Sequence, residues 1–258
     1  MNRTNATLKD MARQMLIGHY QAPMLAIVLT TLIPTALLLP FNYLCSGRSQ
    51  YPSQAIIYYL AYFIITAIEL MLGCGAKLIY LGIARHQTVT VKDMFQIFKA
   101  RPDRILLGSM LYILITWIPM LPSIIYQMTA PATQTNSEAI QFWCIYEALY
   151  AGGIFLGFLL SLPFYLIFWI YADDSNCDTL QAFRRSMRMM RGGKWRIFKM
   201  EFSFIGWTLL GMLSFGIGFL WILPYTDQAI TNFYLDQKHE FDVKIELSDA
   251  PGPFTPNL

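Results

Sequence analysis

Residues 55–83 read AIIYYLAYFIITAIELMLGCGAKLIYLGI, an apolar run of 29 residues that contains only two charged side chains, Glu69 and Lys77. At 1.5 Å per residue, a helix of this length covers about 44 Å, which exceeds the ~30 Å hydrocarbon core of a bilayer. The run therefore predicts a helix that crosses a membrane.

The composition of the whole chain favours the same class of protein. Hydrophobic residues make up 55% of the 258 residues and charged residues only 14%, whereas soluble domains carry about 25% charged residues. The first 20 residues do not resemble a secretory signal peptide, because Asp10, Arg13 and Gln14 interrupt their first apolar stretch. We expect the first membrane span to be retained.

Further apolar runs predict an all-α, polytopic helical bundle with about six membrane spans. The last run, residues 202–234, is too long for one upright crossing, and the Gly-Ile-Gly sequence at 216–218 predicts a tight turn within it. One tilted or broken helix is the alternative and would give five spans. The predicted spans are residues 23–44, 55–83, 105–128, 152–172, 199–215 and 219–235.

Two connecting segments have the pattern of amphipathic helices. Residues 5–20 predict one apolar face opposite Lys9 and Arg13; its members are Leu8, Met11, Ala12, Met15 and Leu16. Residues 91–98 carry a similar apolar stripe, which suits a helix lying in the membrane interface. We expect a single membrane domain over residues 1–235 and a short, flexible cytoplasmic tail over residues 236–258.

The distribution of basic residues predicts the orientation. Of the 19 Lys and Arg residues, 17 fall in segments that six spans place on one side of the membrane, Arg48 falls on the other side, and Lys77 lies within a span. Basic residues accumulate on the cytoplasmic side of a membrane. We therefore expect a multi-pass protein of the plasma membrane with both termini in the cytoplasm.

The sequence RRSMRMMRGGKWR, residues 184–196, is the most basic segment. Acidic and polar residues at 174–178 predict the start of a helix, and Gly192 predicts its end. Leu180, Phe183, Met187 and Met190 recur at helical spacing and predict an apolar face. The basic face and its neighbours are candidates for contact with anionic lipid headgroups or a partner protein rather than nucleic acid: Arg184, Arg185, Arg188, Arg191, Lys194, Trp195 and Arg196.

Three ionisable residues within the spans form a candidate polar site. Glu69 lies near the middle of its span, whereas Lys77 lies near the cytoplasmic end, where its side chain can extend to the interface. Asp227, in the last span, could pair with Lys77. Prolines within the spans could break helices and form a substrate path, or could be ordinary kinks; these are Pro34, Pro40, Pro119, Pro122, Pro163 and Pro224.

Small residues also mark expected points of helix contact. Gly153 and Gly157 form a GxxxG pattern, which is typical of closely packed membrane helices. The four cysteines and three histidines are scattered without metal-ligand spacing. We expect no catalytic residue, no metal site and no cofactor.

Three stretches resemble the bacterial membrane proteins of the domain of unknown function 975 family. They are residues 68–99, residues 170–211 and the sequence FGIGFLWILPYTDQAITNFY at 215–234. The most specific parts are the run from the acidic turn at Asp173 to Arg196 and the signature from Gly216 to Tyr225. The resemblance implies an all-helical protein of the bacterial inner membrane and implies no activity.

Two classes of function remain open from the sequence. One is a non-enzymatic component that organises the membrane, binds lipid or assists a transporter, with membrane lipids, another membrane protein or a second copy of the chain as partner. The other is a small transporter or channel with Glu69, Lys77 and Asp227 along its path. The catalytic motifs of intramembrane enzymes are not evident in the sequence.

Overall fold

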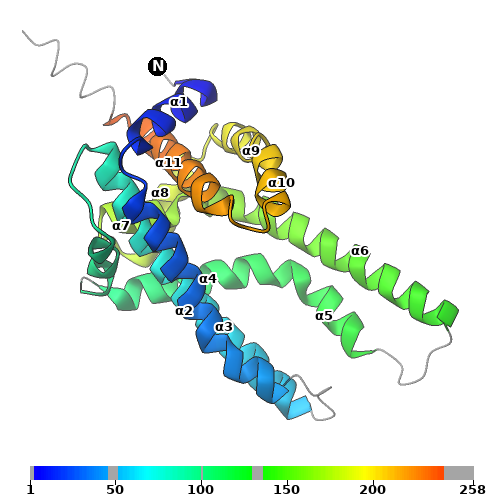
Figure 1. The fold of residues 1–258 in the computed structure, drawn as a ribbon. Coiled ribbons are helices and arrows are strands. Elements are labelled where there is room, and N and C mark those ends of the chain that lie inside the picture. Colours follow the sequence, from blue (N-terminus) through cyan, green and yellow to red (C-terminus); the bar gives the residue numbers. More distant parts are fainter. Residues whose placement is uncertain (1–2, 46–51, 100, 130–135, 241–258) are drawn as a thin grey trace, which may run out of the picture. The chain divides into compact units, whose positions relative to one another are not determined.

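The computed structural model describes residues 3–45, 52–99, 101–129 and 136–240, and every regular element in these ranges is a helix (Figure 1). The predicted tail at 236–258 lies outside the described residues except for residues 236–240. The α-helices are α1 (Asn5–Leu16), α2 (Gln21–Cys45), α3 (Pro52–Ala84), α4 (Pro102–Trp117), α5 (Leu121–Met128), α6 (Asn136–Ser161), α7 (Ile167–Asp173), α8 (Thr179–Met189), α9 (Lys194–Phe202), α10 (Ile205–Leu213) and α11 (Phe219–Gln237). The 3₁₀ helices are η1 (Val91–Phe98), η2 (Ile118–Met120) and η3 (Leu162–Phe164).

Four helical stretches in the described part of the chain are long and apolar enough to cross a membrane. They are Gln21–Tyr43, Ile56–Ala84, Pro102–Met128 and Ser137–Asp173. The first three agree with the predicted spans to within a few residues. This finding supports a helical protein embedded in a membrane.

The fourth stretch begins well before the predicted span at 152–172. Residues 136–151 fall between two of the predicted spans and contain Glu138 and Glu147, but they form the first half of α6. Apolar and aromatic residues outnumber the two acids there, and the 3.6-residue repeat of a helix can place the acids away from a packed face.

The predicted fifth and sixth spans are not confirmed as crossings. Ser203 and Phe204 separate α9 from α10, and the Ser203 hydroxyl donates to the Met200 carbonyl oxygen, a local bond that competes with helix continuation. With nine residues, α10 is about 14 Å long, which is too short to cross alone. The predicted turn is present: Phe215 and Gly216 have positive φ angles, and α11 begins at Phe219.

The chain forms two compact units, each assembled from separated segments. The first unit contains Met1–Leu29, Gly75–Phe95 and Arg191–Leu258, and the second contains Thr30–Cys74 and Gln96–Met190. In the first unit α1 packs along α11 (Figure 1). Leu8, Ala12 and Leu16 of α1 are fully buried, which confirms the apolar face expected there.

In the second unit α6 packs against α4, η2 and α5 (Figure 1). The contact is close because Gly153 and Gly157 lack side chains. A Cβ atom at Gly153 would lie 2.8 Å from the Pro119 carbonyl oxygen, and one at Gly157 would lie 2.8 Å from the Thr116 carbonyl oxygen. The predicted role of this GxxxG pattern in helix packing is confirmed.

The prolines of the predicted spans lie in helices of both kinds. Pro34 and Pro40 lie inside α2, and Pro224 lies inside α11, without ending either helix. Pro119 and Pro163 instead lie in the 3₁₀ helices η2 and η3. Pro122 lies in the first turn of α5. Because α4, η2 and α5 lie within one candidate span, and α6, η3 and α7 within another, the predicted proline breaks are not confirmed.

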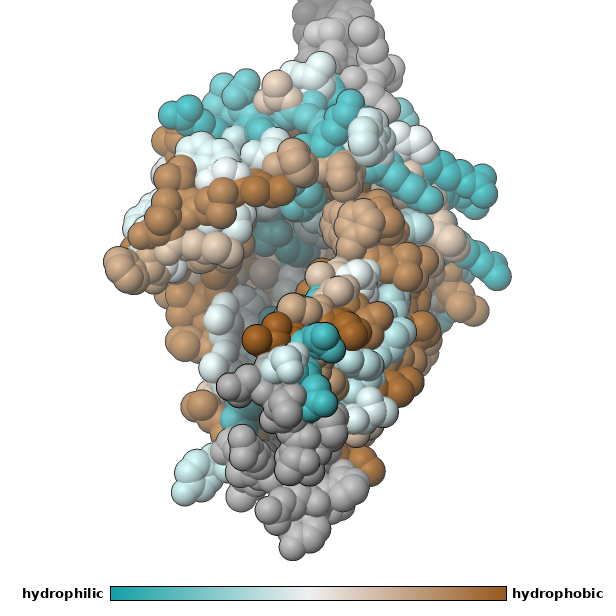
Figure 2. Space-filling view, turned by 90° about the vertical axis from the view of Figure 1, so that its right-hand side faces the viewer, coloured by the Kyte–Doolittle hydropathy of each residue, from teal (hydrophilic) through white to brown (hydrophobic). Residues whose placement is uncertain are grey.

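Much of the molecular surface is apolar. In the face drawn in Figure 2, hydrophobic residues cover wide areas. Exposed large hydrophobic side chains follow α2, α3, α6 and α10 along much of their lengths; examples are Leu32, Leu39, Ile56, Leu60, Phe155, Leu156, Leu209 and Met212. Lipid chains can cover such a surface, whereas soluble monomers rarely expose apolar patches of more than a few hundred Å².

We predict opposite outcomes for neighbouring glycines of α6. The double variant Gly153→Ala and Gly157→Ala should lower the melting temperature in detergent, because each new Cβ would meet backbone that must move away. Gly152→Ala should not lower it, because no atom lies within 4 Å of a Cβ there. Thermal unfolding followed by intrinsic fluorescence tests this, and equal losses in both proteins would contradict the packing.

Candidate functional site

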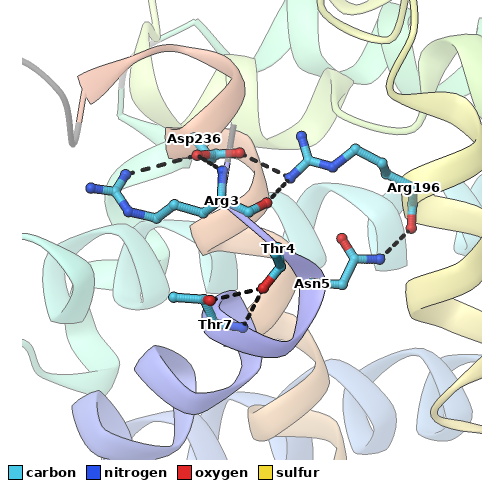
Figure 3. Close-up of polar contacts among 6 residues, drawn as sticks. All are labelled: Arg3, Thr4, Asn5, Thr7, Arg196 and Asp236. Atoms are coloured by element: carbon cyan, nitrogen blue, oxygen red, sulfur yellow. Dashed lines mark hydrogen bonds and ion pairs between the residues drawn. The ribbon is translucent and has the colours of Figure 1, made fainter. Parts of the chain in front are cut away.

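A buried carboxylate joins three helices of the first unit. The Asp236 side chain, at the end of α11, is only 2% exposed. Its Oδ2 atom accepts a hydrogen bond from Arg196 Nη2 of α9 at 3.0 Å, and its Oδ1 atom accepts one from the Arg3 backbone N–H at 3.2 Å (Figure 3). The Arg3 guanidinium lies 3.8 Å from Oδ1. A buried carboxylate needs such partners because loss of water otherwise destabilises its charge.

The partners of Asp236 are themselves held in place. Arg196 donates to the Arg3 carbonyl oxygen, and Asn5 Nδ2 donates to the Arg196 carbonyl oxygen at 2.8 Å (Figure 3). The Arg196 guanidinium also lies over the Phe233 ring, 5.2 Å from its centre. These contacts fix the start of α1 to α9 and to the end of α11.

The predicted pairing of Lys77 with Asp227 is confirmed as a contact. Lys77 Nζ of α3 donates to Asp227 Oδ1 of α11 at 2.6 Å, and their side chains are 14% and 25% exposed. The same ammonium lies 5.7 Å from the centre of the Tyr80 ring. The pair is neutral as a whole, so it can join α3 to α11 within apolar surroundings.

Glu69, the third candidate, belongs to the second unit, whereas Lys77 and Asp227 belong to the first. Glu69 is exposed on α3 and lies about 20 Å from either end of the candidate span at Ile56–Ala84. A carboxylate at such a depth is costly in lipid and is a functional hypothesis by default. Glu69 remains a predicted site residue of the transport hypothesis.

The polar residues of α11 recur at helical spacing. Four residues after Gln228, Asn232 accepts from its side chain at 3.3 Å and donates to the Leu8 carbonyl oxygen of α1 at 3.1 Å. Asp236 lies four residues further along α11. This buried polar stripe was missed in the sequence, because Asp236 was assigned to the tail. The four-residue repeat of polar side chains on an otherwise apolar helix was the available signal.

The basic segment forms α8 and the start of α9. Phe183 and Ser186 of α8 are buried, as is Met190 directly after the helix, and Ser186 Oγ donates to the Pro163 carbonyl oxygen at 3.0 Å. Leu180 and Met187 were expected on the buried face, but they are 60% and 39% exposed. The expected apolar face is therefore divided, because the helix packs through its Thr179–Ala182–Ser186 side.

The basic side chains of this segment have different surroundings. Arg185 forms a 2.9 Å ion pair with the exposed Asp174, and Arg196 is held at Asp236. Trp195 is exposed and stacks on Phe198, with Lys199 over its ring at 5.4 Å. The remaining members are exposed and form no ion pair with any residue that the structure describes; these are Arg184, Arg188, Arg191 and Lys194.

Loss of the Asp236 charge should loosen the first unit. In Asp236→Asn, the shape of the side chain is kept but two guanidinium groups lose their counter-charge, at an expected cost of about 3 kcal/mol in the free energy of unfolding. Amide hydrogen exchange in residues 3–16 should also accelerate. Thermal unfolding and exchange mass spectrometry check both effects.

The matched control is Asp174→Asn, which removes the carboxylate of the exposed pair with Arg185. It should cost less than about 1 kcal/mol, because solvent screens an exposed ion pair. Similar losses in the two variants would show that the Asp236 cluster does not hold the unit together.

Comparison with known proteins adds one relationship. No curated protein and no solved structure matches the chain. Residues 1–240 match the family described as Protein of unknown function (DUF975), in agreement with the resemblance of the acidic turn, the basic segment and the Gly-Ile-Gly signature. The all-helical structure of the described residues, with helices long and apolar enough to cross a membrane, agrees with the helical membrane protein that the resemblance implied. The chain belongs to the DUF975 family.

Proposed function

We propose that this protein is a non-enzymatic component of the bacterial plasma membrane that binds anionic lipid headgroups and thereby organises lipid or a partner membrane protein, such as a transporter. The exposed side of α8 is the observation that supports this role. On this side, arginines that form no ion pair with any described residue lie beside exposed apolar side chains, and the helix packs against the rest of its unit.

The arrangement on α8 suits a membrane interface. Arg184 and Arg188 are four residues apart and therefore lie on one side of the helix. Leu180 and Met187 lie on the same side and are exposed. Apolar groups on such a helix can enter the boundary of the acyl chains while guanidinium groups remain among the phosphates.

The charges supply useful binding energy. A basic residue near an anionic leaflet contributes about 1 kcal/mol, so Arg184, Arg188 and Arg191 together contribute about 3 kcal/mol. That energy corresponds to about a 100-fold preference for an anionic surface over a neutral one. Arg185 contributes less to this preference because Asp174 neutralises it.

We further propose that the chain crosses the membrane four times, with both termini in the cytoplasm. Four crossings place the same 17 basic residues on the cytoplasmic side as six crossings do, because the two counts differ by one hairpin. Residues 202–226 contain no charged side chain, and Phe215 at the α10–α11 turn is 98% exposed. This hairpin would enter the bilayer from the cytoplasmic side and return, since residues 202–215 reach only about 20 Å as helix.

Lipid titration tests the role of α8. The delipidated protein is titrated with phosphatidylglycerol or phosphatidylcholine and the bound lipid is measured by native mass spectrometry. The triple variant Arg184→Gln, Arg188→Gln and Arg191→Gln should lose up to about 100-fold in affinity for phosphatidylglycerol and little for phosphatidylcholine.

The control uses the same helix. Arg188→Gln alone should weaken phosphatidylglycerol binding about fivefold, whereas Arg185→Gln should change it much less. Undiminished phosphatidylglycerol binding by the triple variant would rule out α8 as the headgroup site.

Cysteine labelling tests the path of the α10–α11 hairpin. In a cysteine-free background, Phe215→Cys should not react with a membrane-impermeant maleimide added outside intact cells. Ser46→Cys, between the first two spans, should react and serves as the positive control. Labelling of Phe215→Cys from outside would instead establish six crossings.

A further inference from the structure

The first unit contains an aromatic cavity, whereas α8 belongs to the second unit. Its volume is about 270 Å³, near the lower end of the ~300–1,000 Å³ that is typical of ligand sites. Its wall combines one guanidinium group, four aromatic rings and one aliphatic side chain; the residues are Arg13, Tyr20, Trp207, Trp221, Ile222 and Tyr225.

The helices that form the cavity are fixed to one another. Lys9 Nζ of α1 donates to Ser203 Oγ at 3.0 Å and lies 5.0 Å from the centre of the Phe204 ring. Phe204 in turn meets the Tyr225 ring edge-on at 5.4 Å. The α10–α11 hairpin closes tightly because a Cβ at Gly211 would lie 2.7 Å from the Phe219 ring. The cavity is thus a preformed feature of the unit.

Arg13 is the one charged residue that lines the cavity among the described residues, and the acidic residue Asp10 lies near it on α1. Arg13 is exposed and has no ion pair with any other residue in the described ranges. Asp10 lies three residues earlier on the same side of α1, and the two charges act with opposite sign on the Tyr225 hydroxyl. Burial raises the pKa of Tyr20, so its hydroxyl stays protonated and can donate a hydrogen bond. A ligand that carries both a positive and a negative group therefore suits the site better than a simple anion.

The surroundings of the cavity suit a ligand with acyl chains. Trp207 and Trp221 are about half exposed, and Leu210, one turn after Trp207, is also exposed. Tryptophan and tyrosine favour the headgroup level of a membrane. The apolar side of α10 continues from the cavity toward the exposed Phe215, where chains of a bound lipid can lie.

We propose that this cavity binds a zwitterionic aminophospholipid of the phosphatidylethanolamine class. The phosphodiester pairs with the Arg13 guanidinium and the Tyr20 hydroxyl. The ammonium group pairs with Asp10 and lies against the aromatic rings, whose faces attract cations. This site is separate from the basic side of α8, and it selects a different headgroup.

Native mass spectrometry of the full chain with phosphatidylethanolamine and phosphatidylglycerol tests the proposal. Arg13→Gln should lower the affinity for phosphatidylethanolamine about tenfold, since a hydrogen bond to a charged group is lost, and Trp221→Ala should also lower it. Asp10→Asn should shift the preference toward phosphatidylglycerol, because the site then carries a net positive charge.

Arg185→Gln, an exposed arginine outside the cavity, is the control and should leave phosphatidylethanolamine binding unchanged. Circular dichroism and melting temperature identify any variant that has lost its fold. Arg13→Lys keeps the charge and should retain most of the affinity for phosphatidylethanolamine. Unchanged phosphatidylethanolamine binding in Arg13→Gln, or an unchanged preference in Asp10→Asn, would overturn the proposal. The triple arginine variant of α8 should keep this site, so failure of one lipid site is distinguishable from failure of the other.

Discussion

The buried carboxylate of Asp236 is the constraint on which the first unit depends. A carboxylate with almost no contact with water must be paired, and the groups that pair it come from the start of the chain and from α9. About one turn earlier on α11, Asn232 binds the backbone of α1, and about two and a half turns earlier Asp227 binds Lys77 of α3. One helix thereby joins three segments that are far apart in the sequence, and this polar stripe gives the packing of α11 a unique register.

The second unit is held together in a different way. Its helices approach through glycine, as at Gly153 and Gly157, where backbone meets backbone without a side chain between them. Such contacts do not depend on the exclusion of water, which cannot drive association inside a bilayer. This difference agrees with the wide apolar surfaces of α2, α3 and α6, which lipid chains can cover.

The two proposed lipid sites differ in charge and are therefore expected to recognise different headgroups. On α8 the arginines exceed their acidic partners, which favours an anionic surface and makes binding sensitive to salt. At the aromatic cavity Arg13 lines the wall and Asp10 lies one helical turn away on α1, and we propose that the ring faces supply a directional attraction for an ammonium group. A protein with both kinds of site could hold anionic and zwitterionic lipids at distinct positions, which is a physical basis for organising a membrane without catalysis.

The sequence by itself determined the helical class, the family, three of the four candidate spans, the GxxxG contact and the pair of Lys77 with Asp227. The family rests on the resemblance of three stretches of sequence. The other features follow from length, apolar periodicity and the cost of charge in an apolar environment, which are local properties. Tertiary structure decided the rest. Leu180 and Met187 are exposed because α8 packs through another side. Residues 199–215 form two helices that end and begin around Ser203. Asp236, expected in the tail, is buried at the end of α11. The cavity could not be read from the sequence either, since Arg13, Trp207 and Tyr225 are brought together only by the packing of α1 on the α10–α11 hairpin.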